Sequence, residues 1–420
     1  MTLFISNVTT RKFLMNKMIK MGLAASACGL AMGAAQAQAG GISDNVVKIG
    51  VLTDMSGPYS AIGGQGSVTA ARMAVEDFIA AKKPAFKVEV VFADHQNKSD
   101  IAASKTREWY DRDGVDMVTD GLNSAVALAV AKISAEKNRI MMNVGAGSTR
   151  LTNEDCTPNT AHWAYDTYAL ATGTARALVK QGGTSWYFVS VDYAFGAAME
   201  KDAAEVINSA GGKVVGSVKH PLNASDFSSF MMQAQASNAK VIALASAGGD
   251  TINAIKTAAE FGVNKKQTLA PLLLSINDVH AMGLATAQGL VFTEGFYWDL
   301  NDNTRAWSRR YFSRMKSMPS MVQAGVYSAV SHYLNAVAAS GTDAAPVVMK
   351  RMKDTPVNDI FAKNGKLRDD GRMVHDMYLM QVKRPADSKQ PWDYYKVLAT
   401  IKGEDAFQPM ALSRCPLIKK

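Results

Sequence analysis

The stretch that decides the fold reads KIGVLTDMSGPYSAIGGQGSVTAARMAVEDF and runs from Lys48 to Phe78. It starts within a continuous apolar, β-branched run at 46–52, which is typical of a buried strand. A loop rich in glycine and serine follows, and apolar residues then recur at helical spacing. A strand, a glycine-rich loop and a helix in this order indicate a loop that holds the phosphates of a nucleotide, another anionic group, or no ligand at all.

The same alternation of strand and helix patterns continues along the chain and then starts again. A first set of strand patterns lies at 46–52, 86–92, 115–118 and 140–144. A second set lies at 186–191, 213–218, 240–245 and 268–274. Helix patterns separate the strands within each set. The sequence therefore predicts an α/β fold with two parallel sheets, each covered by helices on both faces.

The last third of the chain does not alternate strand and helix patterns. Helix patterns at 304–314, 323–339 and 345–354 are followed by strand patterns at 375–382 and 392–401. We expect these elements to cover the first lobe and then complete the second lobe, so that the chain crosses between the two lobes more than twice. The crossing strands are expected at 162–166 and 292–296.

The first residues have the features of an export signal. Arg11, Lys12, Lys17 and Lys20 precede a short apolar stretch, and residues 1–39 contain no Asp or Glu. The stretch ends in AQAQAG, which offers two small-x-small cleavage patterns. We therefore predict a signal peptide at 1–39, cleaved near Ala37 or Ala39, and a periplasmic mature protein. A buried N-terminal helix is the alternative, and a membrane span would need about 20 strongly apolar residues.

The charge of the remaining chain argues against a nucleic-acid partner. Without the four basic residues of the predicted signal, 42 Lys and Arg stand against 37 Asp and Glu. They form no long basic run of the kind that nucleic-acid-binding proteins carry. We expect no binding of nucleic acid.

Two cysteines remain after the predicted signal is removed. Cys156 and Cys415 either form a disulfide, as paired cysteines commonly do in an oxidising compartment, or stay as two buried thiols. Their spacing in the sequence does not decide between these two possibilities.

Motifs for a nucleotide, a metal or catalysis are weak or absent. Gly64, Gly66 and Thr69 nearly fit a dinucleotide fingerprint, but about ten residues separate the strand from the first glycine. That fingerprint needs a tight turn from strand to helix. The sequence has no GxxxxGK[ST], HExxH, GxSxG or CxxC, and its six histidines are scattered. We expect no cofactor, no metal and no enzyme activity, although an exported enzyme stays an alternative.

Loops after the strands carry the small and polar residues that suit a ligand. Ligands of open parallel sheets bind beyond the carboxyl ends of the strands, where helix N-termini present free N–H groups. In the first set these loops read SGPYSAIGGQG at 56–66, GLNSA at 121–125 and GAGST at 145–149. Such loops suit a carboxylate, although helix capping by Asn123 or Ser124 uses the same donors. In the second set they read VDYAFG at 191–196, SAGGD at 246–250 and SIND at 275–278.

At this point the sequence resembles the type I periplasmic solute-binding proteins of the branched-chain amino-acid class, which serve ABC importers. The resemblance rests on the opening stretch, on GLNSAVALAVAKISAEKNRIMMNVGAGSTRLT, and on FVSVDYAFG followed by GGKVVG. It implies two Rossmann-like lobes with parallel central sheets, joined by a three-crossover hinge. The lobes are expected at 44–163 plus 296–372 and at 164–295 plus 373–420.

The resemblance also implies a set of ligand-binding residues. From the first lobe, an aromatic cover and a carboxylate-binding set of small and hydroxyl residues are expected at Tyr59, Asn123, Ser124, Gly145, Gly147 and Ser148. From the second lobe and the second crossover, the aromatic and polar candidates are Tyr193, Phe195, Asp250, Ser275 and Trp298.

One departure from the family's pattern bears on the ligand. Members that bind amino acids place an acidic residue after the strand equivalent to 268–274, where this sequence reads LLLSINDVH. If neither Asp250 nor Asp278 reaches the ammonium group, the ligand lacks an amino group. The stretch DCTPNTAHWAYDTYALA resembles the family's aromatic-carboxylate branch. We therefore predict an aromatic or hydrophobic carboxylate ligand and an ABC permease as partner. The alternatives are a branched-chain amino acid and a ligand sensor for a receptor. We expect a monomer.

Overall fold

The computed structural model describes residues 41–419, so the expected signal peptide at 1–39 lies outside the described residues. Within this described part, no helix combines the length and the apolar character that crossing a bilayer requires. The described residues belong to one compact unit.

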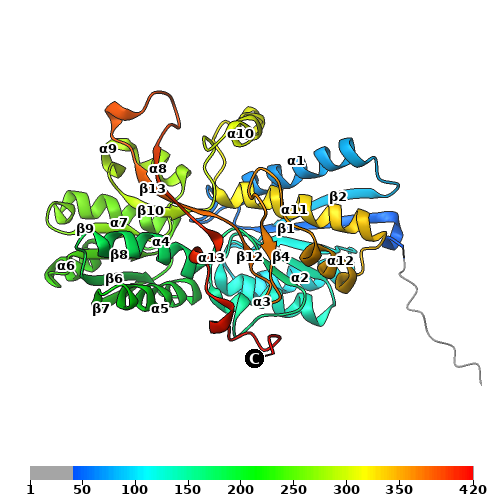
Figure 1. The fold of residues 1–420 in the computed structure, drawn as a ribbon, viewed down its shortest axis with the longest axis horizontal. Helices are drawn as coiled ribbons and strands as arrows, with labels where there is room; N and C mark the ends of the chain where they lie inside the picture. The colour runs from blue at the N-terminus through cyan, green and yellow to red at the C-terminus, as the bar shows by residue number, and fades with distance from the viewer. Residues whose placement is uncertain (1–40, 420) are drawn as a thin grey trace, which may run out of the picture. The chain divides into compact units, whose positions relative to one another are not determined.

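The first sheet is parallel throughout and has the strand order β2-β1-β3-β4-β5. Strands β1, β2 and β4 of this sheet are labelled in Figure 1. Its strands are β1 Val46–Thr53, β2 Lys87–Asp94, β3 Met117–Asp120, β4 Ile140–Asn143 and β5 Thr160–His162. The strand registers place Leu52, Asp120, Asn143 and His162 side by side across the sheet. The carboxyl ends of these strands therefore form one row, from which the predicted binding loops start.

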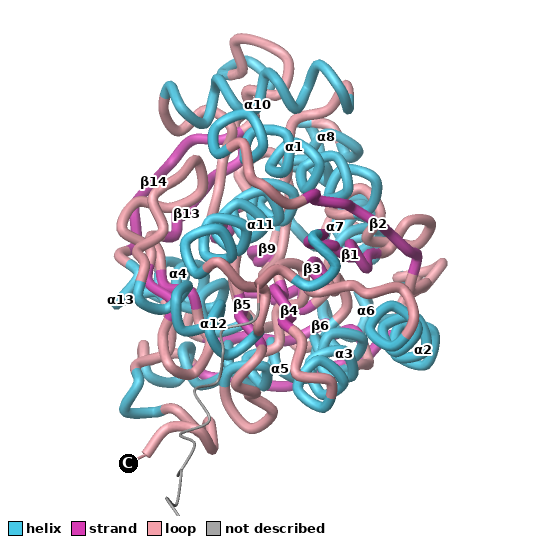
Figure 2. Tube along the Cα trace, turned by 90° about the vertical axis from the view of Figure 1, so that its right-hand side faces the viewer, coloured by secondary structure: helices cyan, strands magenta, loops and turns pink. Residues whose placement is uncertain are grey.

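Helices from both ends of the chain cover this sheet. They are α1 Gly64–Lys82, α2 Ser99–Asp111, α3 Ser124–Glu136, α10 Asp302–Met315, α11 Met321–Ser340 and α12 Ala345–Asp354. The long helix α11 packs between α1 and α12 (Figure 2), and α2 packs on α3. The Ser320 hydroxyl caps α11 and also donates to the Ile62 carbonyl (2.6 Å), which fixes the loop after β1. The expectation that late helices cover the first sheet is confirmed.

The second sheet is also parallel, with the order β7-β6-β8-β9. Its strands are β6 Ser185–Val191, β7 Lys213–His220, β8 Val241–Ala245 and β9 Thr268–Pro271. The helices of this part are α4 Thr167–Lys180, α5 Ala194–Ser209, α6 Ser228–Ala236, α7 Gly248–Glu260, α8 Ile276–Met282 and α9 Leu284–Ala287. The predicted α/β class with two parallel sheets is confirmed.

A third sheet is antiparallel and has the order β10-β13-β14. It includes a segment that we expected to be only a crossing strand between the lobes. Its strands are β10 Val291–Glu294, β13 Met377–Val382 and β14 Tyr395–Ile401. The expected crossing segment 292–296 is thus mostly a strand of this sheet, and the chain leaves it at Gly295. Short elements complete the chain: β11 Lys366–Leu367, β12 Met373–Val374, α13 Gly403–Ala406, and the 3-10 turns Ser43–Asn45, Thr149–Thr152, Val263–Lys265, Pro385–Asp387 and Met410–Leu412.

Two of the three crossings are tied together by one buried arginine. The Arg372 guanidinium donates to the carbonyls of Trp163 and Tyr165 (2.8 Å to Tyr165) and lies 3.5 Å from the Asp166 carboxylate. Because the guanidinium is fully buried, these carbonyls and the carboxylate replace its lost hydration. The first and third crossings therefore form a rigid seam next to the sheets.

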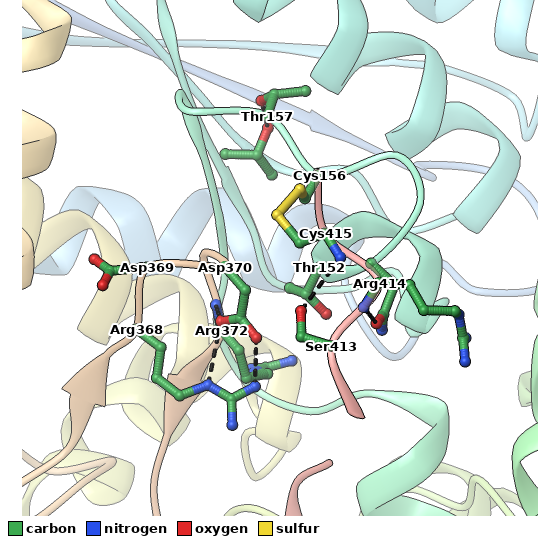
Figure 3. Close-up of a disulfide and its surroundings, with 12 residues drawn as sticks. Thr152, Cys156, Thr157, Arg368, Asp369, Asp370, Arg372, Ser413, Arg414 and Cys415 are labelled. Atoms are coloured by element: carbon green, nitrogen blue, oxygen red, sulfur yellow. Dashed lines mark hydrogen bonds and ion pairs between the residues drawn. A yellow bond between two sulfur atoms is a disulfide. The ribbon is translucent and has the colours of Figure 1, made fainter. Parts of the chain in front are cut away.

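The C-terminal segment returns to the first sheet's side. Figure 3 shows the Cys156–Cys415 disulfide, which closes a loop of 259 residues. Next to the disulfide, the Arg414 N–H donates to the Asn153 side chain (2.9 Å). The structure thus contains the bridge and not the two separate thiols of the alternative interpretation.

Candidate ligand-binding site

A small cavity lies among the loops that follow the strands of both sheets. It is lined by Tyr59, Ile62, Leu122, Ser124, Gly145, Gly147, Tyr165, Tyr193, Phe195, Ala247 and Leu273. Each of these residues follows the carboxyl end of a strand, as expected for a ligand site on open parallel sheets. Six of the eleven predicted binding residues are among them: Tyr59, Ser124, Gly145, Gly147, Tyr193 and Phe195.

The cavity is nearly closed in this conformation. The space that water can enter is about 10 Å³, which is about the volume needed for one water molecule. The Tyr59 and Tyr193 hydroxyls meet across it at 2.9 Å, and the Gly249 N–H donates to the Pro58 carbonyl (3.3 Å). A ligand with even one ring therefore needs the two rims to separate before it enters.

The loop 145–148 is held from several sides, so its backbone is preorganised. The Ala146 carbonyl accepts from His162 Nε2 (2.7 Å) and from the Asn143 amide (2.9 Å). The Tyr165 hydroxyl donates to the Gly145 carbonyl. Burial and the nearby Arg372 cation hold the pKa of His162 well below its usual value, so the ring stays neutral. The Gly145 and Ala146 carbonyls thus already accept hydrogen bonds from other protein groups.

Backbone donors remain at this loop and at the start of α3. Among the hydrogen bonds of residues 41–419, the Ser124 and Gly147 N–H groups have no acceptor. The Ser124 hydroxyl accepts from the Ser148 N–H (3.2 Å), which leaves its proton free to donate. Within the described residues, the cavity lining includes no Lys, Arg or His. The site offers hydrogen-bond donors and a helix N-terminus in place of a cation.

Asn123 and Ser148 have structural partners instead of a place in the lining. Asn123 caps α3 through bonds to the N–H groups of Ala125 (2.9 Å) and Val126 (3.3 Å), so the capping interpretation holds for it. The Ser148 hydroxyl accepts from the Arg150 N–H (3.4 Å) and is fully buried. Both residues support the lining residues Ser124 and Gly147 through the backbone.

Glycine is required at two lining positions by close contacts. A Cβ on Gly145 would lie 2.6 Å from an Asp120 oxygen, and a Cβ on Gly147 would lie 2.9 Å from the Phe195 ring. These distances are shorter than side chains tolerate. The small residues of this loop therefore let an acid and an aromatic ring approach the backbone.

Aromatic side chains form the wall opposite the donors. The rings of Tyr193 and Phe195 are 6.3 Å apart and tilted by 30°. Burial raises the pKa of both the Tyr59 and the Tyr193 hydroxyl above the usual value, well above it for Tyr59. Both hydroxyls therefore stay protonated. This wall suits a flat or apolar body.

The acidic residues on the side of the second sheet already accept hydrogen bonds from nearby protein groups. Asp250 accepts from the N–H groups of Asn223 and Ala224, both at 3.0 Å. Asp278 accepts from the Ser275 N–H (2.8 Å) and hydroxyl (2.9 Å) in a capping box at α8. Neither acid, nor Ser275, lines the cavity.

Trp298 also lies outside the lining. Its indole N–H donates to the Trp392 carbonyl (2.8 Å), which also accepts from the Tyr297 hydroxyl (3.3 Å). The ring therefore anchors the turn between β13 and β14. A ligand contact for Trp298 stays a prediction.

Sequence reasoning missed five lining residues. They are Ile62, Leu122, Tyr165, Ala247 and Leu273. Ile62, Leu122 and Ala247 lie within the loops predicted to face a ligand, but nothing in the sequence singled out their apolar side chains. Leu273 looks like a core residue at the end of a strand pattern. Tyr165 carried a signal, because it follows the first crossing strand at the edge where ligands bind. Across residues 41–419, no group of three or more His, Cys, Asp or Glu side chains could hold a metal ion.

Comparison with known proteins places this chain in a family. A family model described as periplasmic binding protein matches residues 46–390. A periplasmic binding protein from Burkholderia mallei is 56% identical, with a TM-score of 0.88 over 90% of this chain and 100% of the other. A branched chain amino acid ABC transporter periplasmic ligand-binding protein from Burkholderia xenovorans LB400 is 38% identical, with a TM-score of 0.79 over 88% and 99%.

Two more distant similarities are relevant. A Leu/Ile/Val-binding protein homolog 6 from Brucella melitensis is 28% identical over 248 residues, which span 57% of this chain and 62% of the relative. A solute binding protein of an R. palustris ABC transporter, solved in complex with benzoate, shares 20% identity and a TM-score of 0.76 over 89% and 100%. At that identity, the last similarity concerns the fold alone.

Proposed function

The chain belongs to the periplasmic binding protein family, and on that premise we propose that it captures a small carboxylate with an aromatic or hydrophobic body for an ABC permease. The coarser function is that of an ABC-transporter substrate-binding protein, as for the relatives. The ligand, the delivery to a permease and the periplasmic export by the signal at 1–39 are the proposal.

The observation that carries the proposal is the set of free donors on the first sheet's rim. The N–H groups of Ser124 and Gly147 and the Ser124 hydroxyl have capacity to donate, and a helix N-terminus adds its partial positive charge. A carboxylate accepts several such bonds at once. An apolar or aromatic body would then rest against Tyr193, Phe195 and Leu273.

The hydrogen bonds of Asp250 and Asp278 support a ligand without an amino group. Asp250 and Asp278 already accept two hydrogen bonds each from the protein and lie outside the lining. An ammonium buried without a carboxylate partner costs several kcal/mol. These contacts favour a ligand without an amino group.

A branched-chain amino acid is the second candidate. The relative from B. xenovorans carries that description and shares 38% identity over most of both chains. The apolar lining residues Ile62, Leu122 and Leu273 suit a branched aliphatic body as well as a ring. A sensor role with the same ligand would differ only in the partner.

Capture requires the two rims to move apart and close again. We propose that the moving bodies are the expected lobes, 44–163 plus 296–372 and 164–295 plus 373–420. The contacts across the cavity support this proposal, because they join Pro58 and Tyr59 of one body to Gly249 and Tyr193 of the other.

A thermal-shift screen tests the proposal, because a ligand that binds only the native state raises the melting temperature. Benzoate, cinnamate and aliphatic acids are compared with leucine, isoleucine and valine. We expect the acids to stabilise the protein. Stabilisation by the amino acids alone would make the second candidate correct.

Substitution of Ser124 identifies the site that binds. Ser124→Ala should weaken an acid ligand by about 1 to 3 kcal/mol, since it removes one donor to a charged group. The matched control is Ser134→Ala on the same helix, whose hydroxyl bonds Tyr110 (2.8 Å) far from the cavity. Equal losses in the two variants would exclude Ser124 from the site.

A further inference from the structure

Asp120 is a buried acid at the carboxyl end of β3 that the proposed function leaves unused. Its side chain is fully buried, and within the described part of the chain neither carboxyl oxygen has a hydrogen-bond partner. Its φ of 78° lies in the left-handed region, which aspartate adopts more readily than most residues other than glycine. A buried polar group without partners is costly, so its retention calls for a functional explanation.

The Asp120 carboxyl lies directly behind the donor-bearing wall of the cavity. One oxygen lies 2.6 Å from the position that a Cβ on Gly145 would take, and the other lies 3.1 Å from that position on Gly63. Gly145 and Leu122 both line the cavity, and Leu122 is two residues from Asp120. One layer of backbone thus separates this acid from the place proposed for the ligand carboxylate.

No cation lies among the groups that act on Asp120. The titratable groups that face it are Asp54, from the loop after β1, and Tyr165, from the first crossing. The hydroxyls of Thr53 and Ser67 lower its pKa, yet neither reaches good hydrogen-bond geometry. Burial is the largest cause, and it raises the pKa of Asp120 to about 6. The acid therefore titrates close to neutral pH.

We propose that Asp120 selects for ligand charge by making capture of an anion depend on the uptake of one proton by its own carboxyl group. This inference rests on the proposed function, since it assumes a carboxylate at Ser124 and Gly147. Two negative charges separated by one backbone layer repel each other strongly in a buried site. Protonation of Asp120 removes that repulsion.

The sign of the pH dependence follows from linkage. An anion nearby raises the pKa of Asp120 above its value in the free protein, so the complex binds more protons than its separate components. Affinity is then highest below about pH 6 and falls, by up to tenfold per pH unit, as the pH rises from there toward the higher value in the complex. A ligand with an ammonium group next to Asp120 would show the opposite sign, because it would favour the ionised acid.

The experiment is titration calorimetry of the full mature chain at pH 7 with the best acid from the screen. Two buffers of different ionisation enthalpy are used, so that the number of protons exchanged is measured directly. We expect net proton uptake on binding. Proton release would overturn the inference and assign Asp120 to an ammonium group, and no exchange would overturn it too. Failure of every carboxylate to bind would overturn both the inference and the proposed function.

Variants locate the proton. Asp120→Asn keeps the shape of the side chain and tolerates the positive φ. It should abolish proton uptake and tighten acid binding at pH 8 by about tenfold, while affinity at pH 5.5 changes little. The matched control is Asp116→Asn, at the other end of β3, whose acid is also buried with a pKa raised to about 6 mainly by burial. Proton uptake that persists in Asp120→Asn, or that disappears in Asp116→Asn, would overturn the inference while leaving carboxylate binding intact.

Discussion

Buried carboxyl groups lie beneath both rims of the cavity, but their surroundings differ. On the second sheet's side, Asp250 and Asp278 each accept two hydrogen bonds from nearby backbone or hydroxyl groups. On the first sheet's side, Asp120 has no partner within the described residues, although free N–H donors are present one layer away at Ser124 and Gly147.

The difference separates acids that hold loops from the acid that we propose responds to the charge of the ligand. The second rim uses its carboxylates to fix the turns before α6 and α8, so it presents an apolar and aromatic wall. The first rim also has a buried acid that holds a loop, Asp54, which accepts from the Gly57 and Tyr59 N–H groups (2.7 and 2.9 Å). It differs from the second rim because, among the described residues, it keeps free donors close to one unpaired acid, Asp120. On the proposed function, the first sheet would recognise the charge of the ligand and the second sheet its shape.

The largest expected effect comes from the point where the two rims touch. Gly248 has a φ of 55°, and a Cβ there would lie 2.3 Å from the Pro58 carbonyl oxygen. Gly248→Ala should block closure and weaken ligand binding by at least about 100-fold, beyond the strain of about 1 to 2 kcal/mol that the backbone adds. Calorimetry would measure the loss of ligand affinity, and small-angle scattering would measure the failure to close.

Gly249→Ala is the control for that variant. A Cβ on Gly249 would meet only the Pro58 Cβ at 3.8 Å, an ordinary contact, and its N–H bond to Pro58 remains. Closure and affinity should be preserved. A Gly248→Ala protein that closes normally would show that the rims do not meet as described.

Removing a structural acid tests the second rim. Asp250→Ala leaves the Asn223 and Ala224 N–H groups without their acceptor, so it should lower the free energy of unfolding by about 2 to 4 kcal/mol. Urea denaturation measures this loss. If ligand affinity dropped while stability stayed the same, Asp250 would be a ligand-binding residue and the contrast between the rims would be wrong.

Removing the unpaired acid should have the opposite sign. The folded-state pKa of Asp120 is about 6 against an ordinary 3.8, so its stabilising contribution is complete below pH 3.8 and is lost as the pH rises through 6. Asp120→Asn should therefore raise the free energy of unfolding by about 1 to 3 kcal/mol at pH 8. The gain should vanish by pH 4, and a loss of stability at pH 8 would mean that Asp120 has a partner.

The smallest expected effect concerns the hydroxyl pair across the cavity. Tyr193→Phe removes the bond to Tyr59 (2.9 Å) but keeps the ring. It should weaken the closed state by about 0.5 to 1.5 kcal/mol, seen as a twofold to tenfold change in affinity. A larger loss would indicate that the hydroxyl also bonds the ligand.

Sequence patterns predicted the fold well because its strands are buried on both faces. The continuous apolar runs at 46–52 and 240–245 are typical of strands in a parallel sheet, and the structure has β1 and β8 there. Helices α4, α8 and α9 were missed. The α4 sequence, TYALATGTARALVK, places Thr and Gly among its apolar residues, and these residues lower its helix propensity.

The sequence predicted only part of the site, because the rest depends on which residues the fold brings together in space. Ser124, Gly145 and Gly147 stand in loops whose small residues mark a ligand site in the sequence. Leu122 and Leu273 look like any core residue. Asp120 ends a buried strand, and only the registers of β1, β3 and β4 show that its carboxyl group lies behind Gly145.

The most direct test of the division between the rims uses ligands that differ only in one amino group. Calorimetry at pH 7 would compare 3-phenylpropanoate with L-phenylalanine, and 4-methylpentanoate with L-leucine. Because the cavity lining formed by the described residues contains no acid to pair an ammonium, the acid of each pair should bind at least about 100-fold more tightly than its amino analogue. Tighter binding of L-phenylalanine or L-leucine would contradict the account.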